Sequence, residues 1–512
     1  MSGPPPNPFN HHAERSFMQT ETPQFQNHIA GRAEPARAGR SFTSTNPATG
    51  APWGRFADSD ADDVDRAVRA AQAALDGEWG RLSNTRRGRL LMAWGERIAA
   101  HSEVIARLES AQNGKLLAEM KAQATVVREW LYYFGGLADK IEGRVIPLER
   151  QSVLNYTLRE PLGVIGVIVP WNSPTFLTIM SCAPALAAGN TVVLKPSEVT
   201  SASAFELVRL AEEAGIPPGT LNVVTGARAA GEALVDHPGV AKICFTGSDG
   251  AGRAIAARAG ARLASCTLEL GGKSPNIVFD DAPVDNAVVG LLSGIFAAAG
   301  QTCIAGSRAY IHERIYDQVV ERLVQRARAI RLGDPLAADT QMGPAATAAQ
   351  LDKNLSLVAK AVSAGGEVLQ GGRRATVPGL EQGYFFEPTI LHRLGRDNPI
   401  LEEEVFGPVL AVLPFSDDDE VLALANGNRF GLAAGVWTRD LRRAHSMARR
   451  LQAGTVWINT YRAMAFNSPF GGYKDSGIGR VNGMESVEQF LQTKSVWCET
   501  SDEIQDPFVL KV

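Results

Sequence analysis

The sequence is poor in cysteine and carries no excess of positive charge. Its five cysteines, in 512 residues, are too few and too irregularly spaced for a disulfide framework or a zinc site. We therefore expect a reducing compartment, the cytoplasm, and no metal. With 51 Lys and Arg against 55 Asp and Glu, the net charge is −4, so the composition does not indicate a surface for nucleic acid.

Long hydrophobic runs are also absent. The opening residues lack the apolar stretch behind a basic start that is typical of a secretion signal. The most hydrophobic segment, residues 287–300, is shorter than the roughly 20 residues that span a bilayer. We expect no membrane partner, and a length that allows about three folding units.

The first part of the chain changes character near residue 40. Residues 1–40 are rich in Pro, Asn, Gln, His and Arg and are predicted to be a flexible extension. Apolar residues then recur every three or four positions, which predicts helices at about 62–75, 85–100 and 117–135.

Short apolar strands alternate with helices through the centre. Strands are predicted at 164–170, 191–195, 221–225 and 242–246, and helices at about 176–188, 202–214, 229–237 and from 250. This alternation indicates βαβ units and a Rossmann-like parallel sheet, whose ligands lie at the carboxyl ends of the strands. We assign residues 41–145 and 162–274 to this cofactor-binding domain.

A second α/β domain is predicted over residues 275–483. Two extended pieces, 152–159 and 494–498, belong to neither domain. Exposed alternating strands usually pair with something, so residues 146–161 and 484–512 are predicted to form a bridging element for dimers or tetramers.

Polar motifs interrupt the apolar strands at several points. They are VPWNSP at 169–174, KPSE at 195–198, FTGS at 245–248, LELGGKSPN at 268–276, GQTCIAGSR at 300–308, EEEVFGPVL at 402–410 and SPFGGYKDSGIGR at 468–480. In order and spacing they resemble the NAD(P)-dependent aldehyde dehydrogenase superfamily, from about residue 45 to 483. The resemblance implies the fold above, an aldehyde substrate and a homo-oligomer.

The resemblance also implies three catalytic roles. Cys303 is the expected nucleophile, because a thiolate and an aldehyde give a hemithioacetal and, after loss of hydride, a thioester. Glu269 is the expected general base. Asn172 is expected to hold the oxyanion with the backbone N–H of Cys303. Taken alone, Cys303 is more typical of a small core residue, and Glu269 of a turn.

For the cofactor, Glu198 favours NAD over NADP, because a carboxylate accepts hydrogen bonds from ribose hydroxyls and repels a 2′-phosphate. NADP stays possible. The cofactor contacts implied by the resemblance are Trp171, Lys195, Ser197, Glu198, Gly247, Ser248, Gly271, Glu404 and Phe406.

The residues expected to line the substrate tunnel are Thr125, Ser173, Phe176, Leu177, Met180, Ala297, Thr302, Ile304, Arg462, Met464 and Phe470. Small residues at Ser173 and Ala297 predict a wide tunnel for a polar or bulky catabolic aldehyde or semialdehyde. Arg462 is either an anion-recognition group at the tunnel entrance or a solvated loop arginine, and the second interpretation is the simpler.

Two other functions stay open. One is a CoA-acylating semialdehyde dehydrogenase, which Glu269 disfavours because the acylating branch generally lacks that base. The other is a non-catalytic structural or binding relative, which the intact set of Cys303, Glu269 and Asn172 disfavours.

Overall fold

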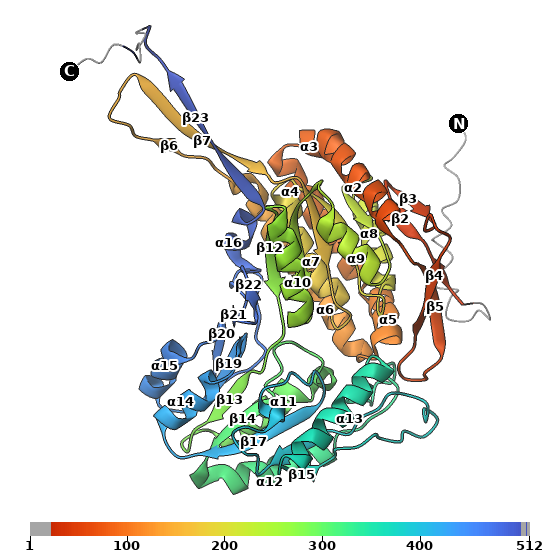
Figure 1. Cartoon of the computed structure of the whole chain (residues 1–512), viewed down its shortest axis with the longest axis vertical. Coiled ribbons are helices and arrows are strands. Elements are labelled where there is room, and N and C mark those ends of the chain that lie inside the picture. The colour runs from red at the N-terminus through yellow and green to blue at the C-terminus, as the bar shows by residue number, and fades with distance from the viewer. Residues whose placement is uncertain (1–21, 503–507, 509–512) are drawn as a thin grey trace.

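Two α/β halves and a three-stranded arm make up the molecule (Figure 1). The computed structural model describes residues 22–502 and 508. Part of the predicted flexible extension, residues 1–21, and the end of the predicted bridging element, 503–507 and 509–512, lie outside the described residues.

The first half is built on an eight-stranded sheet with a parallel centre. Its order is β22-β12-β11-β8-β9-β10-β2-β3. The central strands are β12 Ser265–Glu269, β11 Val240–Thr246, β8 Val164–Ile168, β9 Thr191–Lys195 and β10 Leu221–Val223. Strands β8, β9 and β10 are buried along their whole length, as expected of parallel strands covered on both faces.

Helices surround this sheet. They are α2 Ala61–Asp76, α3 Glu78–Arg81, α4 Asn84–Ala100, α5 Ser102–Asn113, α6 Leu117–Leu137, η2 Ala138–Lys140, α7 Pro174–Ala187, α8 Ala202–Glu213, α9 Arg228–Asp236 and α10 Asp249–Ala261. Helix α2 begins at a capping box between Asp60 and Asp63 and buries the stripe that includes Val64, Val68 and Ala71. All but α3, α5 and η2 lie where the periodicity predicts them.

The flexible extension predicted for residues 1–40 does not hold for residues 24–34, which form three strands. Strands β2 Asn27–Ile29 and β3 Arg32–Glu34 extend the first sheet, and β1 Gln24–Phe25 pairs with β5 Pro52–Ala57 next to β4 Ser41–Thr45. The polar composition of residues 24–34 gives no strand pattern, because these strands are stabilised by pairing with distant segments, β5 and β10. Asn27 is fully buried, and its Oδ1 accepts hydrogen bonds from Ser59 Oγ and Thr225 N at 3.0 Å each.

The second half is built on a seven-stranded sheet of order β15-β16-β17-β14-β13-β19-β20. Its strands are β13 Pro275–Val278, β14 Arg308–His312, β15 Glu367–Gln370, β16 Thr389–His392, β17 Val409–Phe415, β19 Ala433–Trp437 and β20 Thr455–Ile458. Its helices are α11 Val284–Ile295, η3 Ala297–Gly300, η4 Glu313–Ile315, α12 Tyr316–Arg328, α13 Ala348–Ser363, η5 Pro399–Leu401, α14 Asp418–Asn426 and α15 Leu441–Arg450.

The chain returns to the first half near its C-terminal end. Strand β21 Tyr473–Lys474 pairs with β18 Phe430–Gly431, but β22 Gly477–Ile478 pairs with β12 of the first sheet. Helix α16 Gly483–Glu488 follows, and Phe490 O accepts a hydrogen bond from Asn190 Nδ2 of the first half. Residues 477–490 therefore fasten the two halves together.

The two extended pieces that fitted neither domain pair with each other. Strand β23 Leu491–Glu499 runs antiparallel to β7 Val153–Pro161, and β6 Val145–Ile146 pairs with the other edge of β7. Figure 1 shows this sheet projecting from the body. Val145 and Trp497 expose 72% and 64% of their surface there.

No helix among the described residues is long and apolar enough to cross a membrane.

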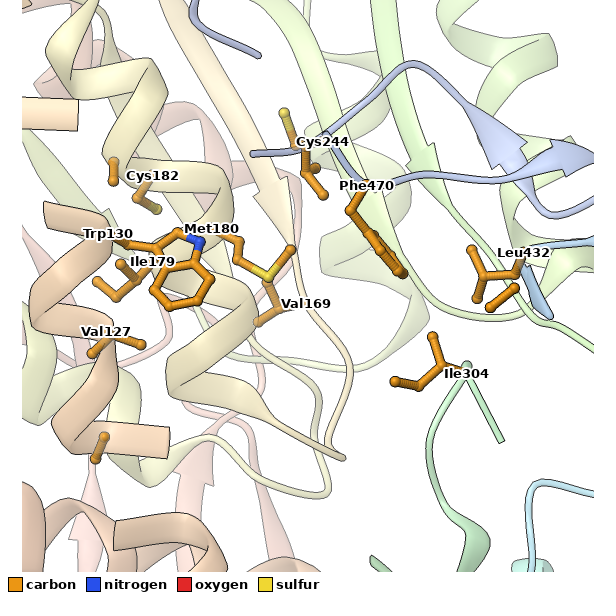
Figure 2. Packing of buried hydrophobic residues seen from close by; sticks show 14 of the residues in the cluster. Val127, Trp130, Val169, Ile179, Met180, Cys182, Cys244, Ile304, Leu432 and Phe470 are labelled. Carbon is orange, nitrogen blue, oxygen red and sulfur yellow. The ribbon is translucent and has the colours of Figure 1, made fainter. Parts of the chain in front are cut away.

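One buried hydrophobic cluster joins the two halves (Figure 2). On one side it contains Trp130 of α6, Val169 after β8 and Met180 of α7. On the other it contains Ile304 and Phe470, which come from loops of the C-terminal part. The segments that carry the predicted site residues are therefore held in one core.

Candidate active site

Asn172 lies in the short loop between strand β8 and helix α7. Helix α5 makes hydrogen bonds to this loop before and after Asn172, through Asn113 and Glu109, and these two residues are called the clamp below. Asn113 Nδ2 donates to Trp171 O at 3.1 Å. Glu109 Oε1 accepts from Thr175 N at 2.9 Å and from Thr175 Oγ1 at 2.6 Å. These buried bonds fix the backbone just before and just after Asn172.

Cys303 lies in the loop between helix α11 and strand β14, which is tied to Asn172 through its neighbour Gln301. Asn172 Nδ2 donates to Gln301 O at 3.2 Å. The Gln301 side chain donates to Pro344 O at 3.1 Å and accepts from Ala346 N at 2.8 Å. Because one hydrogen of the Asn172 amide is used here, the other is available to an oxygen in the pocket.

The Cys303 thiol is in an environment that disfavours its charged form. Burial, followed by the negative charges of Glu404 and Glu269, raises the pKa of Cys303 to about 12. The backbone N–H groups of Cys303 and Ile304 act in the opposite direction, because hydrogen bonds to the sulfur favour the thiolate. The thiol therefore needs a base to become a nucleophile at neutral pH.

Glu269 ends strand β12 and is the base that the resemblance predicts. It is 6% exposed, and neither carboxylate oxygen has a hydrogen-bond partner among the described residues. Burial raises the pKa of Glu269 well above its ordinary value, and the positive charge of Arg480 opposes that rise. A carboxylate left unpaired in this way is a stronger base than one in water.

Cys303, Glu269 and Asn172 line one pocket of about 360 Å³ between the halves. Most of the predicted residues also line it. They are Trp171, Ser173, Phe176, Leu177, Met180, Gly247, Ser248, Gly271, Thr302, Ile304, Glu404, Phe406, Arg462, Met464 and Phe470. The fold therefore brings residues from the two halves to one pocket.

The cofactor side of the pocket is formed by the start of helix α10 and by loops packed closely against it. Ser248 caps α10 by accepting a hydrogen bond from Ala251 N. Glu404 Oε1 accepts from Gly272 N at 3.0 Å, and a Cβ on Gly271 would lie 2.4 Å from Glu404 Oε2. Gly271 is thus required for this approach, and burial raises the pKa of Glu404.

Three predicted cofactor residues lie outside the pocket wall, at the end of strand β9. Lys195 Nζ is 3.6 Å from Glu198 Oε2, and the Glu198 side chain is half exposed. Burial lowers the pKa of Lys195, whereas Glu198 raises it. Ser197 is buried beside them. This edge belongs to the same parallel sheet, so these residues lie where a parallel sheet commonly binds its ligand.

Two predicted tunnel residues are not in the pocket wall. Thr125 faces solvent and bonds to Lys121 O of its own helix, and Ala297 begins η3 without reaching the wall. Helix α6 instead contributes Gln123. The sequence analysis missed Gln123 because periodicity identifies the buried stripe of α6 but not which flanking residue reaches the pocket.

Five further wall residues were also missed: Pro170, Thr246 and Leu270, which lie within the predicted motifs, and Gln350 and Lys353, which do not. Gln350 and Lys353 come from α13, and Gln350 Nε2 donates to Val405 O at 2.9 Å, next to Glu404. No sequence signal marked Gln350 and Lys353, since both are polar residues on an otherwise ordinary helix.

All five cysteines are free thiols. The described residues contain no group of three or more His, Cys, Asp or Glu side chains that could hold a metal ion.

Comparison with known proteins shows the family of this chain. The family model described as "Aldehyde dehydrogenase family" matches residues 34–496. The chain belongs to the aldehyde dehydrogenase family. This aldehyde dehydrogenase has the predicted fold and enzyme class, which are thereby confirmed.

Proteins similar in sequence include named dehydrogenases, and a solved structure similar in fold contains NAD+. The (Z)-2-((N-methylformamido)methylene)-5-hydroxybutyrolactone dehydrogenase of Acinetobacter baylyi is 42% identical over 95% of this chain and 100% of its own. A betaine aldehyde dehydrogenase of Brucella anthropi is 42% identical over 93% and 98%. The NAD+ complex of a Bacillus cereus aldehyde dehydrogenase has a TM-score of 0.92 and 38% identity over 95% and 99%.

Proposed function

We propose that this aldehyde dehydrogenase oxidises a polar aldehyde to its carboxylate with NAD, through a thioester on Cys303. The observation that carries the proposal is the convergence of the Cys303 sulfur, the Glu269 carboxylate and the Asn172 amide on one pocket. Each lies on a separate segment, and hydrogen bonds or close packing fix each position.

The residues on the cofactor side fit NAD. Glu198 is half exposed at the sheet edge, where a ribose hydroxyl can donate to it, and the first turn of α10 leaves open space over Gly250 for a pyrophosphate. Trp171 and Phe406 pack edge to face at 5.4 Å beside the pocket. When bound, NAD accepts the hydride that aldehyde oxidation releases.

In the first step, Glu269 takes the thiol proton of Cys303, and the sulfur attacks the aldehyde carbon. The C=O bond becomes a C–O⁻ bond, which accepts a hydrogen bond from the free hydrogen of Asn172 Nδ2. When the carbonyl reforms, loss of hydride leaves a thioester on Cys303.

Between the two steps, Glu269 releases the thiol proton to solvent. In the second step, Glu269 takes a proton from a water molecule that attacks the thioester carbon. The C–S bond then breaks, the carboxylic acid leaves, and the Cys303 thiolate takes the proton back from Glu269. Glu269 can serve both steps because burial raises its pKa, which makes the carboxylate a stronger base.

The substrate side supports a polar aldehyde. Arg462, Gln123 and Thr302 line the same pocket as the apolar Phe176, Leu177 and Met464. The Acinetobacter relative is named for a hydroxybutyrolactone with an N-methylformamido group, which is polar and uncharged. A mixed wall of this kind is suited to a substrate with an apolar body and a polar end.

NADH formation from a panel of aliphatic, aromatic, hydroxylated and carboxylated aldehydes tests the proposal, with NAD and NADP in parallel. We expect turnover with NAD, and an acyl adduct on the peptide that contains Cys303 in mass spectra of enzyme quenched during turnover. Dependence of NADH formation on added CoA would support the acylating alternative, and NAD binding without turnover on any aldehyde would support the non-catalytic one.

We also propose a cytoplasmic homo-oligomer. The arm of β6, β7 and β23 projects from the body with Val145, Leu154 and Trp497 exposed, and β20 is an edge strand of the second sheet. Pairing of such edges between copies would cover them. Light scattering separates a dimer or tetramer from a monomer.

A further inference from the structure

The expected nucleophile lies in a tight turn whose backbone is held from a distant segment. Ala305 N donates to Thr302 O at 3.1 Å, so Cys303 and Ile304 are the two central residues of this turn. The hydroxyl of Tyr461, in the loop after strand β20, donates to Ile304 O at 2.9 Å. No other group among the described residues donates to that oxygen.

The Tyr461 ring fills a slot that three glycines leave open. A Cβ on Gly294 of helix α11, on Gly306 after the turn or on Gly435 of strand β19 would lie only 2.9 to 3.1 Å from the ring. The Trp457 ring packs against it, with the two centroids 4.6 Å apart. Tyr461 is buried, and burial raises its pKa, so the hydroxyl keeps its proton and stays a donor.

The two ends of the turn are tied to other segments by separate hydrogen bonds. Before the turn, Gln301 O accepts from Asn172, and after it Gly306 N donates to Gly294 O at 3.0 Å. Between these two points, the bond from Tyr461 is the one hydrogen bond among the described residues that ties the turn to another segment. The orientation of the turn therefore depends on this hydroxyl.

That orientation matters for the reactivity of the sulfur. Hydrogen bonds from the N–H groups of Cys303 and Ile304 favour the thiolate, against the burial that disfavours it. A rotation of the turn would carry these donors away from the sulfur, and the sulfur away from Glu269. A displacement of about 1 Å at a reacting group can lower a rate about a hundredfold.

Given the proposed function, on which this inference rests, we propose that Tyr461 is a positioning residue for Cys303. Its O–H holds the Ile304 carbonyl and so keeps the sulfur and the two N–H groups in the orientation that attacks the aldehyde. Tyr461 does not itself line the pocket, but its loop continues into Arg462 and Met464 of the pocket wall. The same loop thus fixes the nucleophile and the substrate side relative to each other.

The variant Tyr461→Phe removes the hydroxyl and keeps the ring in its slot. We expect kcat for aldehyde oxidation to fall about tenfold, with little change in KM for NAD, because the change is confined to the nucleophile. Tyr310→Phe is the matched control. Tyr310 is also buried in the second half, its hydroxyl donates to Leu424 O at 3.3 Å, and it does not line the pocket. At a similar loss of Tm, it should keep the wild-type kcat.

Alkylation of Cys303 by iodoacetamide measures the state of the thiol without turnover. Its rate is followed against pH on the peptide that contains Cys303, by mass spectrometry, because the exposed Cys498 also reacts. In Tyr461→Phe the profile should move to higher pH by about 0.5–1, since the N–H groups favour the thiolate less, and in Tyr310→Phe it should not move. The charged groups that act on the sulfur are the same in both variants: Glu269, Glu404 and Lys115.

A kcat and an alkylation profile of Tyr461→Phe equal to those of the wild type would overturn the positioning role. Losses shared equally by Tyr310→Phe would reduce that role to general stability and would overturn it as well. Absence of wild-type turnover with every aldehyde would instead overturn the proposed function. The alkylation profiles would then still show whether Tyr461 holds the turn that carries Cys303.

Discussion

Two buried glutamates, one in the clamp and one in the pocket, differ in their hydrogen bonding. Glu109, in the clamp under the site, accepts two hydrogen bonds from Thr175, whereas Glu269, in the pocket, has no hydrogen-bond partner among the described residues. Burial raises the pKa of both, but only for Glu109 do hydrogen bonds act against the rise. In the clamp, one oxygen of Glu109 accepts the hydrogen bonds that fix a backbone and the other, Oε2, has no partner among the described residues, whereas in the pocket neither oxygen of Glu269, the proposed base, has one.

The largest effect should follow loss of the nucleophile. Cys303→Ala should lower kcat for NADH formation at least about a thousandfold, because no other thiol lines the pocket among the described residues. Cys498→Ala, at an exposed thiol on β23, is the control and should retain activity. If Cys303→Ala kept more than a tenth of the wild-type rate, the thioester mechanism would be wrong.

The next largest effect should follow loss of the unpaired carboxylate. Glu269→Gln should lower kcat about a hundredfold to a thousandfold, since it cannot take a proton from the thiol or from water. The wild-type rate should rise with pH through the raised pKa of Glu269, because only the ionised carboxylate is a base. A pH–rate profile should therefore lose this ascending limb in the variant, and a profile of unchanged shape would assign the base elsewhere.

Stability gives the same carboxylate an independent test. Because its pKa is higher in the folded than in the unfolded chain, Glu269 stabilises the fold fully only below its unfolded value, near pH 4, and loses this contribution as pH rises through the folded pKa. Glu269→Gln should therefore gain in Tm over the wild type as pH rises from 5 to 8. An equal difference in Tm at both pH values would contradict the unpaired state.

A smaller loss of kcat should distinguish Asn172, the proposed oxyanion donor, from Asn113, which holds the backbone beside it. Asn172→Ala should lower kcat about a hundredfold, since it removes a donor. Asn113→Ala should lower kcat about tenfold by freeing Trp171 O and the backbone before Asn172.

The matched control for Asn113 is Asn222→Ala. Asn222 is also buried, accepts from Ala30 N at 3.0 Å and donates to Gly219 O at 2.6 Å, but lies away from the pocket. At a similar loss of Tm, only Asn113→Ala should lower kcat with little change in KM for NAD. Equal losses of kcat in both variants would reduce the role of Asn113 to general stability.

The sequence, through its resemblance, pointed to the residues that line the pocket but not to the residues that support them. Apolar runs such as 191–195 predict strands, and the resemblance names Glu269 and Cys303 as the base and the nucleophile. The clamp was not predicted, because α5 buries polar residues, Glu109, Gln112 and Asn113, in place of an apolar stripe. Strand β2 was not predicted because His28 pairs with Val223, far along the chain. Such contacts exist only once the halves pack.

The smallest effect should follow a change at Glu198. Unlike Glu109 and Glu269, this glutamate is half exposed, and its Oε2 lies 3.6 Å from Lys195 Nζ. Glu198→Gln should raise the ratio of kcat/KM for NADP to that for NAD about tenfold, since it removes repulsion of a 2′-phosphate and leaves the Lys195 ammonium available. Its loss also removes an influence that raises the pKa of Lys195, so the gain should shrink as pH rises and that amine loses its proton. Glu232→Gln, at an exposed ion pair with Arg228, is the control. An unchanged ratio in Glu198→Gln would show that this carboxylate, like that of Glu109, serves the scaffold rather than the ligand.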